Sequence, residues 1–114
     1  HVDISSQAMS VRVNGWHHAS WRVSTGREGY YTPRGSYSVK RMAKVYYSKK
    51  YDNAPMPNSV FFYGGYAIHG TNSVSRLGRP ASHGCVRLAP GNAAALYALV
   101  QRHGASRTRI TLTN

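Results

Sequence analysis

In residues 9–13 apolar and polar side chains alternate one by one, in the order Met9-Ser10-Val11-Arg12-Val13. This period of two predicts a strand with one buried face. Asn14-Gly15 comes next, and the dipeptide favours a type I′ hairpin turn because both residues accept a positive φ. We therefore expect strands within residues 2–13, a turn, and a returning strand that carries Trp16.

Three later segments also predict strands. A turn marked by proline and glycine precedes residues 36–39, which return to an extended pattern. Residues 60–63 form a short apolar run that ends at Gly64-Gly65, as is typical of a buried strand. Residues 107–113 alternate again, so a strand is expected near the C-terminal end of the chain.

One segment changes to a helical period. Its apolar side chains recur three or four positions apart, at Ala93, Leu96, Leu99 and Val100. Asn92 is the expected N-cap and Gly104 the expected C-terminal stop. The hydrophobic pattern therefore predicts a mainly β chain with one substantial helix over about residues 92–103.

Residues 40–59 lack a regular pattern. Basic residues are interleaved with tyrosines there, and two prolines oppose a helix or a central strand. A basic, tyrosine-rich segment can bind single-stranded nucleic acid by stacking and phosphate contacts. Because no nucleic-acid motif accompanies the segment, we favour a solvated loop or a flap over a cleft, and we expect no nucleic-acid partner.

The composition is that of one folded domain with a strong positive charge. With 114 residues and 41% hydrophobic side chains, the chain can bury a core without metals or disulfides. Its formal net charge is +12, and Asp3, Glu28 and Asp52 are its only acids. Such a charge favours polyanions, and envelope polymers that carry carboxylates satisfy it as well as nucleic acid does. No apolar run is long enough to span a bilayer.

Cys85 is the only cysteine, so the chain cannot form an internal disulfide. A thiol attacks as its thiolate, a form that nearby imidazole or cationic groups favour. His83 precedes the cysteine by two residues, Arg87 follows it by two, and His69 lies upstream. Taken alone, however, a single cysteine fits a small buried structural thiol at least as well as a nucleophile.

The same side chains raise the alternative of a metal site. Zinc accepts histidine and cysteine ligands, and His69, His83 and Cys85 could supply three of them. No Cys-x-x-Cys or His-Glu-x-x-His spacing and no nearby carboxylate completes such a site. We therefore predict no metal and no cofactor.

The residues around Cys85 resemble a known family signature. His69 is followed by a twelve-residue spacer and then by Ser82-His83-Gly84-Cys85-Val86-Arg87. This arrangement resembles the signature of the L,D-transpeptidase catalytic domain, the YkuD-type family of bacterial cell-wall enzymes. The likeness extends upstream, because Val23-Ser24-Thr25-Gly26 and the Thr32-Pro33-x-Gly35-x-aromatic segment are similar to a second, structural hallmark of that family. The resemblance implies a β-sandwich of mixed sheets, with residues 1–114 forming a single catalytic domain and residues 40–59 contributing to a lid.

The resemblance also implies roles for the site residues. Cys85 is the expected nucleophile and His69 its base, with the carbonyl of Gly70 holding the second imidazole nitrogen in place of a triad acid. His83 is expected to support the site. The N–H groups of Gly84 and Cys85 are expected to face the oxyanion.

Four further residues complete the predicted site. Ser82 is expected to bond within its turn. Arg87 stands where many family members carry Asn. Its guanidinium is a candidate for binding a substrate carboxylate, and the alternative is that the side chain of Arg87 is solvated. We also place Asn72 and Tyr63 among the substrate-binding residues.

The implied activity is acyl transfer on peptidoglycan stem peptides. Cys85 would form a thioester with release of D-alanine, and a neighbouring stem amine would resolve it as a cross-link between third residues. Water as acceptor would give an L,D-carboxypeptidase, and an envelope protein as acceptor would give an anchoring enzyme. The resemblance further implies export to the periplasm or cell envelope and acylation by carbapenems. A second class of hypothesis is a non-enzymatic basic module that binds nucleic acid or an anionic wall polymer.

Overall fold

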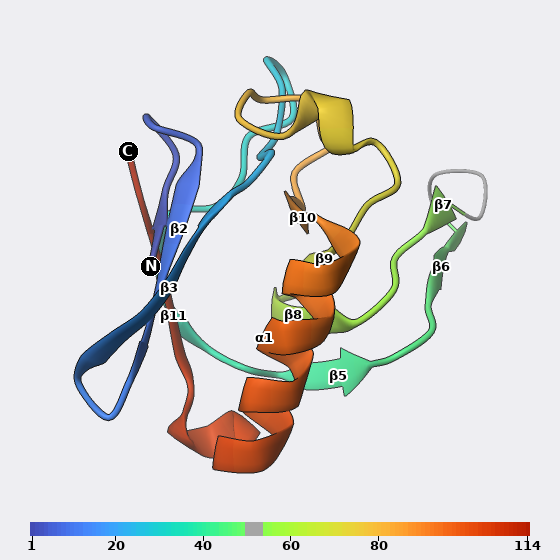
Figure 1. Ribbon diagram of the computed structural model, residues 1–114. Coiled ribbons are helices and arrows are strands. Elements are labelled where there is room, and N and C mark those ends of the chain that lie inside the picture. Colours follow the sequence, from blue (N-terminus) through green and yellow to red (C-terminus); the bar gives the residue numbers. More distant parts are fainter. Residues whose placement is uncertain (50–53) are drawn as a thin grey trace.

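The computed structural model describes residues 1–49 and 54–114. Over these residues the chain folds into two β-sheets that pack face to face, with one long helix beside them (Figure 1). The first sheet has five strands, in the order β3 (Trp16–Arg22), β2 (Ala8–Val13), β1 (Val2–Asp3), β11 (Arg109–Thr113) and β4 (Gly35–Ser38). The second has four, in the order β10 (Val86–Leu88), β9 (Tyr66–Gly70), β8 (Ser59–Tyr63) and β5 (Arg41–Ala43). The short strands β6 (Tyr47–Ser48) and β7 (Ala54–Pro55) pair only with each other.

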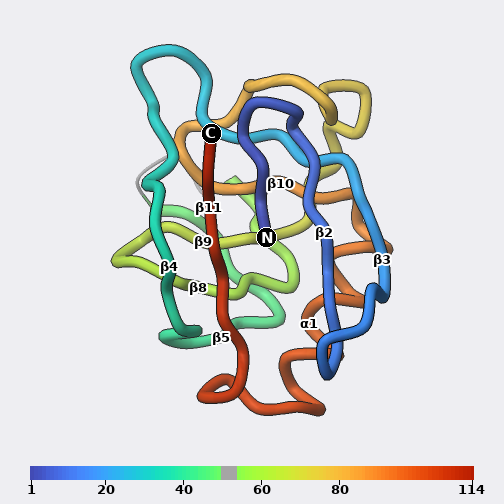
Figure 2. Tube along the Cα trace, turned by 90° about the vertical axis from the view of Figure 1, so that its left-hand side faces the viewer, coloured from blue at the N-terminus to red at the C-terminus, as the bar shows by residue number. Residues whose placement is uncertain are grey.

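Each large sheet contains one parallel pair. In the first sheet β1 runs parallel to β11, and Figure 2 shows these two strands side by side although they lie at opposite ends of the sequence. In the second sheet β10 runs parallel to β9, with Val86 opposite Ile68 and Arg87 opposite His69. The mixed-sheet sandwich expected from the sequence is therefore confirmed.

The expected hairpin turn is also confirmed. Asn14 and Gly15 have φ values of 53° and 84°, so both occupy the left-handed region that a type I′ turn requires. The strands β2 and β3 pair on either side of the turn, with a register shift between Val11 and Arg12.

The helix α1 (Pro90–His103) begins two residues earlier than expected. Asn92 is not its N-cap. Ala89 holds that position without a side-chain bond, and Pro90 begins the helix, where its missing N–H costs nothing and its fixed φ suits the first turn. The predicted stop is correct, because Gly104 has a φ of 98° and donates its N–H to the carbonyl of Val100.

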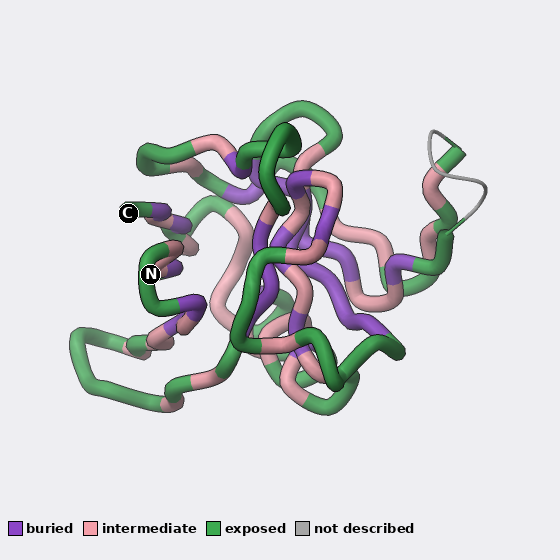
Figure 3. The backbone as a smooth tube through the Cα atoms, turned by 90° about the horizontal axis from the view of Figure 1, so that it is seen from above, coloured by how far each residue is buried: buried purple, intermediate pink, exposed green. Residues whose placement is uncertain are grey.

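The second sheet is buried on both faces. On one face Val60, Phe62 and Ile68 pack with apolar side chains of the first sheet and of α1. On the other face Phe61 and Ala67 pack against a smaller group that includes Met56 and Cys85. This double burial explains why residues 60–63 form a continuous apolar run instead of an alternating one. Figure 3 shows the buried segments gathered at the centre and the exposed ones at the loops.

Residues 40–59 are more regular than the sequence suggests. Residues Arg41–Ala43 form β5, which pairs with β8 at the edge of the second sheet, and only the β6–β7 unit stands away from the sandwich (Figure 1). Residues 50–53, which the sequence analysis assigned to the same flap, lie outside the described residues.

The described part of the chain also contains the 3₁₀ turns η2 (Val74–Arg76), in the loop before the Cys85 segment, and η3 (Ala105–Arg107), after the helix. None of the helices in the described chain is long and apolar enough to cross a membrane.

Candidate active site

Cys85 lies immediately before β10 and beside β9. Continuing the parallel register by two residues from Arg87 and His69 places Cys85 opposite Ala67, and the Ala67 N–H points at the sulfur with an N···Sγ distance of 3.4 Å. Side chains two positions apart on a strand share a face, so Cys85, Arg87, Ala67 and His69 lie on the same face of the sheet. Diagonal neighbours on adjacent strands have Cβ atoms about 7–8 Å apart, which brings Cys85 and His69 within side-chain reach.

His69 is held rigidly at the end of β9. Its Nδ1 donates to the carbonyl oxygen of Gly70 at 2.7 Å, so Nε2 is the nitrogen that remains as an acceptor. Gly70 in turn donates its N–H to the Pro57 carbonyl at 2.9 Å. A Cβ at position 70 would lie 3.2 Å from the Cβ of Ala93 and 3.3 Å from Pro57 Cγ. Helix α1 and the loop at Pro57 therefore hold Gly70 in place, and with it the carbonyl that orients the imidazole.

The imidazole of His69 is neutral at physiological pH. Burial lowers its pKa from 6.5 to about 4, the bond to the Gly70 carbonyl opposes this shift, and the charge of Arg87 adds to it. A neutral, buried imidazole with a fixed Nδ1–H and a lone pair on Nε2 is suited to accept a proton.

The thiol of Cys85 is also neutral in the resting state. Burial raises its pKa, while the Ala67 N–H and the positive charge of Arg87 act in the opposite direction. On the other side the thiol faces the carbonyl of Gly65 at 3.9 Å, a weak contact that suits S–H better than a thiolate. The pair therefore rests as thiol and imidazole, so an attack by the sulfur would require a transfer of its proton.

The turn before Cys85 is fixed by its own hydrogen bonds. The Ser82 hydroxyl donates to the Cys85 carbonyl at 2.6 Å and accepts the Gly84 N–H at 3.0 Å. The expected bond of Ser82 within the turn is thus present. The N–H of Gly84, expected to face the oxyanion, therefore already donates to Ser82 in this geometry, and its oxyanion role stays a prediction.

Thr32 connects this turn to the upstream hallmark, a role that the sequence does not reveal. Its buried hydroxyl donates to the Gly84 carbonyl at 2.7 Å and accepts the Gly26 N–H at 2.9 Å. The Thr-Pro motif was visible in the sequence, but its partner lies 52 residues away. Ser24 adds a second tie, because its N–H and C=O pair with the backbone of Arg87.

Gly84 has a φ of 123°, a conformation that other residues adopt only under strain. A Cβ at this position would lie 2.6 Å from Cε1 of Tyr66, so the ring packs directly on the glycine. The glycine is therefore required both for the backbone turn and for the close approach of the β8–β9 hairpin.

A pocket of about 210 Å³ joins the predicted residues. His69, Cys85, His83, Arg87 and Asn72 all line it, together with Ser82, Thr71, Ser73, Met56 and three residues of the β6–β7 unit, Ser48, Ala54 and Pro55. No acid lines this pocket among the described residues. Tyr63 is absent from the lining and lies instead on the hairpin beyond Cys85.

His83 is more exposed than the other histidine of the site. Its ring meets the edge of Tyr30 with centroids 4.8 Å apart, and its Nε2 lies 3.5 Å from the guanidinium of Arg27. Partial burial and the charges of Arg27 and Arg87 lower its pKa. These contacts suit a supporting residue at the pocket rim. Within the described chain, His69, His83 and Cys85 do not form a cluster able to hold a metal ion.

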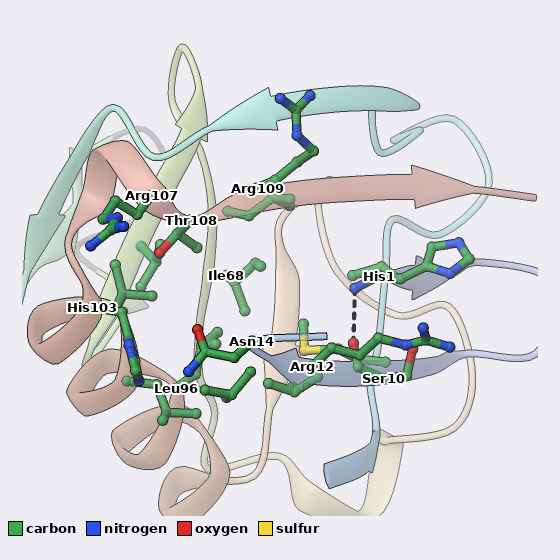
Figure 4. A pocket seen from close by; sticks show the side chains of 18 residues that line it. His1, Ser10, Arg12, Asn14, Ile68, Leu96, His103, Arg107, Thr108 and Arg109 are labelled. Carbon is green, nitrogen blue, oxygen red and sulfur yellow. Dashed lines mark hydrogen bonds between the residues drawn. The ribbon is translucent and has the colours of Figure 1, made fainter. Parts of the chain in front are cut away.

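A larger cavity of about 460 Å³ lies on the opposite face of the second sheet (Figure 4). Residues of β2, β11 and α1 line it, and Figure 4 shows Ile68 near its centre and Leu96 beside the helix. Neither Cys85 nor His69 lines it. Because Ile68 and His69 point to opposite faces of β9, the two cavities are separated by the strand.

Comparison with known proteins agrees with this geometry. The family model of the L,D-transpeptidase catalytic domain, YkuD, matches residues 1–110. No curated protein is significantly similar to the chain in sequence.

Solved structures share the fold over nearly the whole chain. An L,D-transpeptidase from Mycobacterium smegmatis superimposes with a TM-score of 0.87 at 24% identity, covering 99% of this chain and 57% of that one. One from Stackebrandtia nassauensis gives 0.86 at 27% identity, with coverages of 99% and 53%. One from Xylanimonas cellulosilytica gives 0.78 at 29% identity, with coverages of 98% and 58%.

The chain therefore spans somewhat more than half the length of these solved relatives. The family model covers nearly all of the chain, and the fold and the Cys85 segment agree with it. The chain belongs to the family of L,D-transpeptidase catalytic domains.

Proposed function

We propose that residues 1–114 form a single catalytic domain that transfers an acyl group from a peptidoglycan stem peptide through Cys85. One observation carries the proposal. Cys85 and His69 share one pocket, and the bond from His69 Nδ1 to the Gly70 carbonyl leaves the Nε2 lone pair as the acceptor. A nucleophile and an oriented base in one pocket are the minimum requirement for acyl transfer.

The first half-reaction acylates the enzyme. His69 Nε2 takes the proton of Cys85 as Sγ attacks the carbonyl between the third residue and the terminal D-alanine. When the tetrahedral intermediate collapses, the carbon–nitrogen bond breaks and the imidazolium returns the proton to the leaving amine. D-Alanine departs and a thioester remains on Cys85.

The second half-reaction transfers the acyl group. The amine of a neighbouring stem attacks the thioester carbonyl and gives its proton to His69. The carbon–sulfur bond breaks, and the sulfur regains a proton from the imidazolium. The product is an amide cross-link, and the enzyme returns to its resting thiol and imidazole.

One group stabilises the negative charge that develops on the attacked carbonyl oxygen, and another binds the carboxylate that the leaving group already carries. Since Ser82 holds the Gly84 N–H, the N–H of Cys85 itself is the nearer donor for the oxyanion. Arg87 is half-buried in the pocket beside the sulfur, and its guanidinium can hold the carboxylate of the departing D-alanine. Asn72 and His83 complete the polar lining on the same side.

The acyl acceptor decides between closely related activities. Water would make the chain an L,D-carboxypeptidase, and an amine of an envelope protein would make it an anchoring enzyme on the same site. Ser48, Ala54 and Pro55 of the β6–β7 unit line the pocket beside Cys85, so we expect this unit to contact an incoming acceptor. A substrate in the cell wall implies that the domain works in the periplasm or cell envelope. The basic charge suits an anionic wall polymer, and no nucleic acid partner is proposed.

β-Lactams offer a probe of the thiol. One solved L,D-transpeptidase structure is a complex with imipenem, and another, L,D-transpeptidase 3 from Mycobacterium tuberculosis, contains a faropenem-derived adduct. We extend this to the chain described here and expect imipenem to acylate Cys85. Intact-mass analysis should show the adduct on the wild type and none on Cys85→Ala.

The decisive experiment uses purified tetrapeptide muropeptides, with wild type and Cys85→Ala side by side and products identified by mass spectrometry. Dimers that have lost one D-alanine, absent from the variant, establish transpeptidation. Tripeptide monomers alone identify the carboxypeptidase. The absence of any Cys85-dependent product, together with a thiol that imipenem does not acylate, supports the non-enzymatic binding module instead.

A further inference from the structure

One end of the sandwich combines exposed arginines with an exposed tryptophan. Three elements meet there: the turn between β2 and β3, the last turn of α1, and η3 (Figures 1 and 2). Arg12, His103 and Arg107, one from each of these elements or the strand beside it, line the same cavity of about 460 Å³. We name five residues of this region the basic end: Arg12, Trp16, Arg102, His103 and Arg107.

The arginines of the basic end have no acid beside them in the described chain. Arg12, Arg102 and Arg107 are exposed. Asp3 lies at the other end of β2, and Glu28 lies in the turn that bonds to the active-site segment. The helix dipole accounts for a cation in the last turn of α1 but not for Arg12 or Arg107. The basic end therefore presents a positive potential that attracts an anionic partner.

The basic end also offers apolar surface. Trp16 is 80% exposed, the largest exposed fraction among the large apolar side chains of the described residues. The adjoining cavity is lined in part by Val11, Val13, Leu96 and Leu99, all of which are only partly buried. Its volume falls within the range of about 300–1,000 Å³ that is typical of ligand-binding cavities. Positive charge, an exposed indole and an apolar cavity thus occur together.

This combination fits the surface of an anionic bilayer better than a soluble polyanion. Phosphate headgroups pair with arginines, and an indole ring favours the boundary between headgroups and acyl chains because its body is apolar and its N–H is polar. A nucleic acid or an anionic wall polymer would match the charge but leave the apolar lining of the cavity without a partner. We propose that the basic end docks the domain on a membrane surface rich in anionic phospholipids, with Trp16 inserted among the headgroups.

Docking in this way directs the catalytic pocket away from the membrane. The strand β3 begins at Trp16 and ends at Arg22, and Ser24 beyond it pairs with Arg87 of the active-site segment. The seven residues of the strand, at about 3.3 Å each, separate the two ends of the sandwich by about 20 Å. Because charges in physiological salt are screened over about 8 Å, changes at the basic end should not alter the chemistry at Cys85.

The first test measures sedimentation with vesicles in physiological salt. Equimolar phosphatidylcholine and phosphatidylglycerol should bind the wild type, and phosphatidylcholine alone should bind it more than about tenfold less tightly. Arg12→Gln/Arg107→Gln should weaken binding to the anionic vesicles about 25-fold, because each basic residue near such a surface contributes about fivefold. The matched control is Arg22→Gln/Arg79→Gln, which removes two exposed charges at the other end of β3 and should keep most of the affinity. Equal losses in the two double variants would overturn the proposal, because net charge alone would then explain the binding.

The second test follows the insertion of Trp16. In a Trp21→Phe background the emission reports Trp16 alone, and anionic vesicles should shift it to shorter wavelength. Trp16→Ala should weaken vesicle binding about tenfold, the contribution of a large apolar side chain removed from water. Tyr31→Ala is the matched control, since Tyr31 is 66% exposed and lies outside the basic end. Vesicle binding without the emission shift, or single-stranded DNA that binds as tightly and with the same dependence on Arg12 and Arg107, would overturn the bilayer as the partner.

A third measurement separates this inference from the proposed function. The variants of the basic end should release D-alanine from a soluble tetrapeptide at the wild-type rate, since neither the substrate nor the pocket involves a membrane. Vesicle binding by a chain that forms no Cys85-dependent product would overturn the transpeptidase proposal and keep the membrane docking. Normal product formation by a chain that does not bind anionic vesicles would overturn the membrane docking alone.

Discussion

Arg87 lies directly opposite His69 in the parallel pairing of β10 and β9, and its charge acts on both members of the candidate catalytic pair. It lowers the pKa of the His69 imidazole and opposes the rise that burial imposes on the pKa of the Cys85 thiol. Arg87 therefore favours the ionised form of the sulfur but disfavours the imidazolium, so its two effects act in opposite directions on proton transfer from sulfur to nitrogen.

This relationship predicts the effect of neutralising position 87. Arg87→Ala should raise the pKa of Cys85 further, because burial then acts without the nearby charge. The measurement is the rate of iodoacetamide alkylation between pH 7 and 10, whose midpoint should move upward in the variant. Arg87→Lys retains a charge and should keep most of the wild-type profile. An unchanged profile for Arg87→Ala would show that the guanidinium does not act on the sulfur.

His69 makes the stability of the fold depend on pH. Its pKa is about 4 in the folded chain and 6.5 when exposed, so between these values the unfolded chain binds a proton that the folded chain excludes. The free energy of unfolding should therefore fall as the pH drops from 6.5 toward 4, by up to about 3 kcal/mol, and flatten below. Urea unfolding at several pH values measures the slope.

The control for that slope is His69→Gln, which removes the titrating group but keeps most of the volume. Its unfolding free energy should vary less across the same window. If the variant and the wild type show the same slope, another group is responsible. The pKa of His83 is lowered as well, so the His69→Gln variant should keep a part of the slope in the same direction.

Gly84 should not tolerate a side chain. Gly84→Ala places a methyl group against the ring of Tyr66 and forces a non-glycine residue to a φ of 123°, a conformation that costs about 1–3 kcal/mol. We expect a lower melting temperature and slower acylation, since the turn also carries Cys85. The double variant Gly84→Ala/Tyr66→Ala removes the steric contact but not the backbone strain, so it should recover only part of the loss. Full recovery would show that the φ value carries no strain.

The buried hydroxyl of Thr32 should matter for both stability and catalysis. Thr32→Val keeps the shape but leaves the Gly26 N–H and the Gly84 carbonyl without their partner, at a cost of about 1–3 kcal/mol. Because Gly84 precedes Cys85, the proposed nucleophile, imipenem acylation should slow as well. Thr111→Val is the matched control, since its hydroxyl meets only the exposed Ser36 hydroxyl and should change stability by under about 0.5 kcal/mol. Similar losses in both variants would contradict the special role of Thr32.

The local part of this fold could be predicted from the sequence. The alternation in β2, the Asn14-Gly15 turn and the end of α1 at Gly104 each depend on residues that are neighbours in the chain. The same holds for the contact between His69 and the carbonyl of the adjacent Gly70, which the family resemblance implies.

The rest depends on contacts between distant segments, which leave no local pattern. The hydroxyl of Thr32 meets Gly84 across 52 residues, and the Tyr66 ring that excludes a side chain at Gly84 belongs to another hairpin. The helix start was misplaced because Pro90 needs no N-cap side chain, whereas the prediction relied on one at Asn92. Tyr63, a predicted substrate-binding residue, lies at the end of β8 and outside the pocket that contains Cys85 and His69, so its role stays a prediction.

The neutral resting state of the pair leads to the sharpest prediction about the nucleophile. Burial raises the pKa of the Cys85 thiol, so simple alkylation, which needs a thiolate, should be slow at pH 7 and accelerate in alkaline solution. Acylation by imipenem should instead be fast at pH 7, because His69 removes the proton during the attack. His69→Gln should slow acylation about 100-fold or more, the usual contribution of a general base, while alkylation at high pH changes little. If His69→Gln slows acylation and alkylation alike, His69 only shapes the site. If alkylation is already fast at pH 7 and does not depend on His69, the thiolate exists before the substrate arrives.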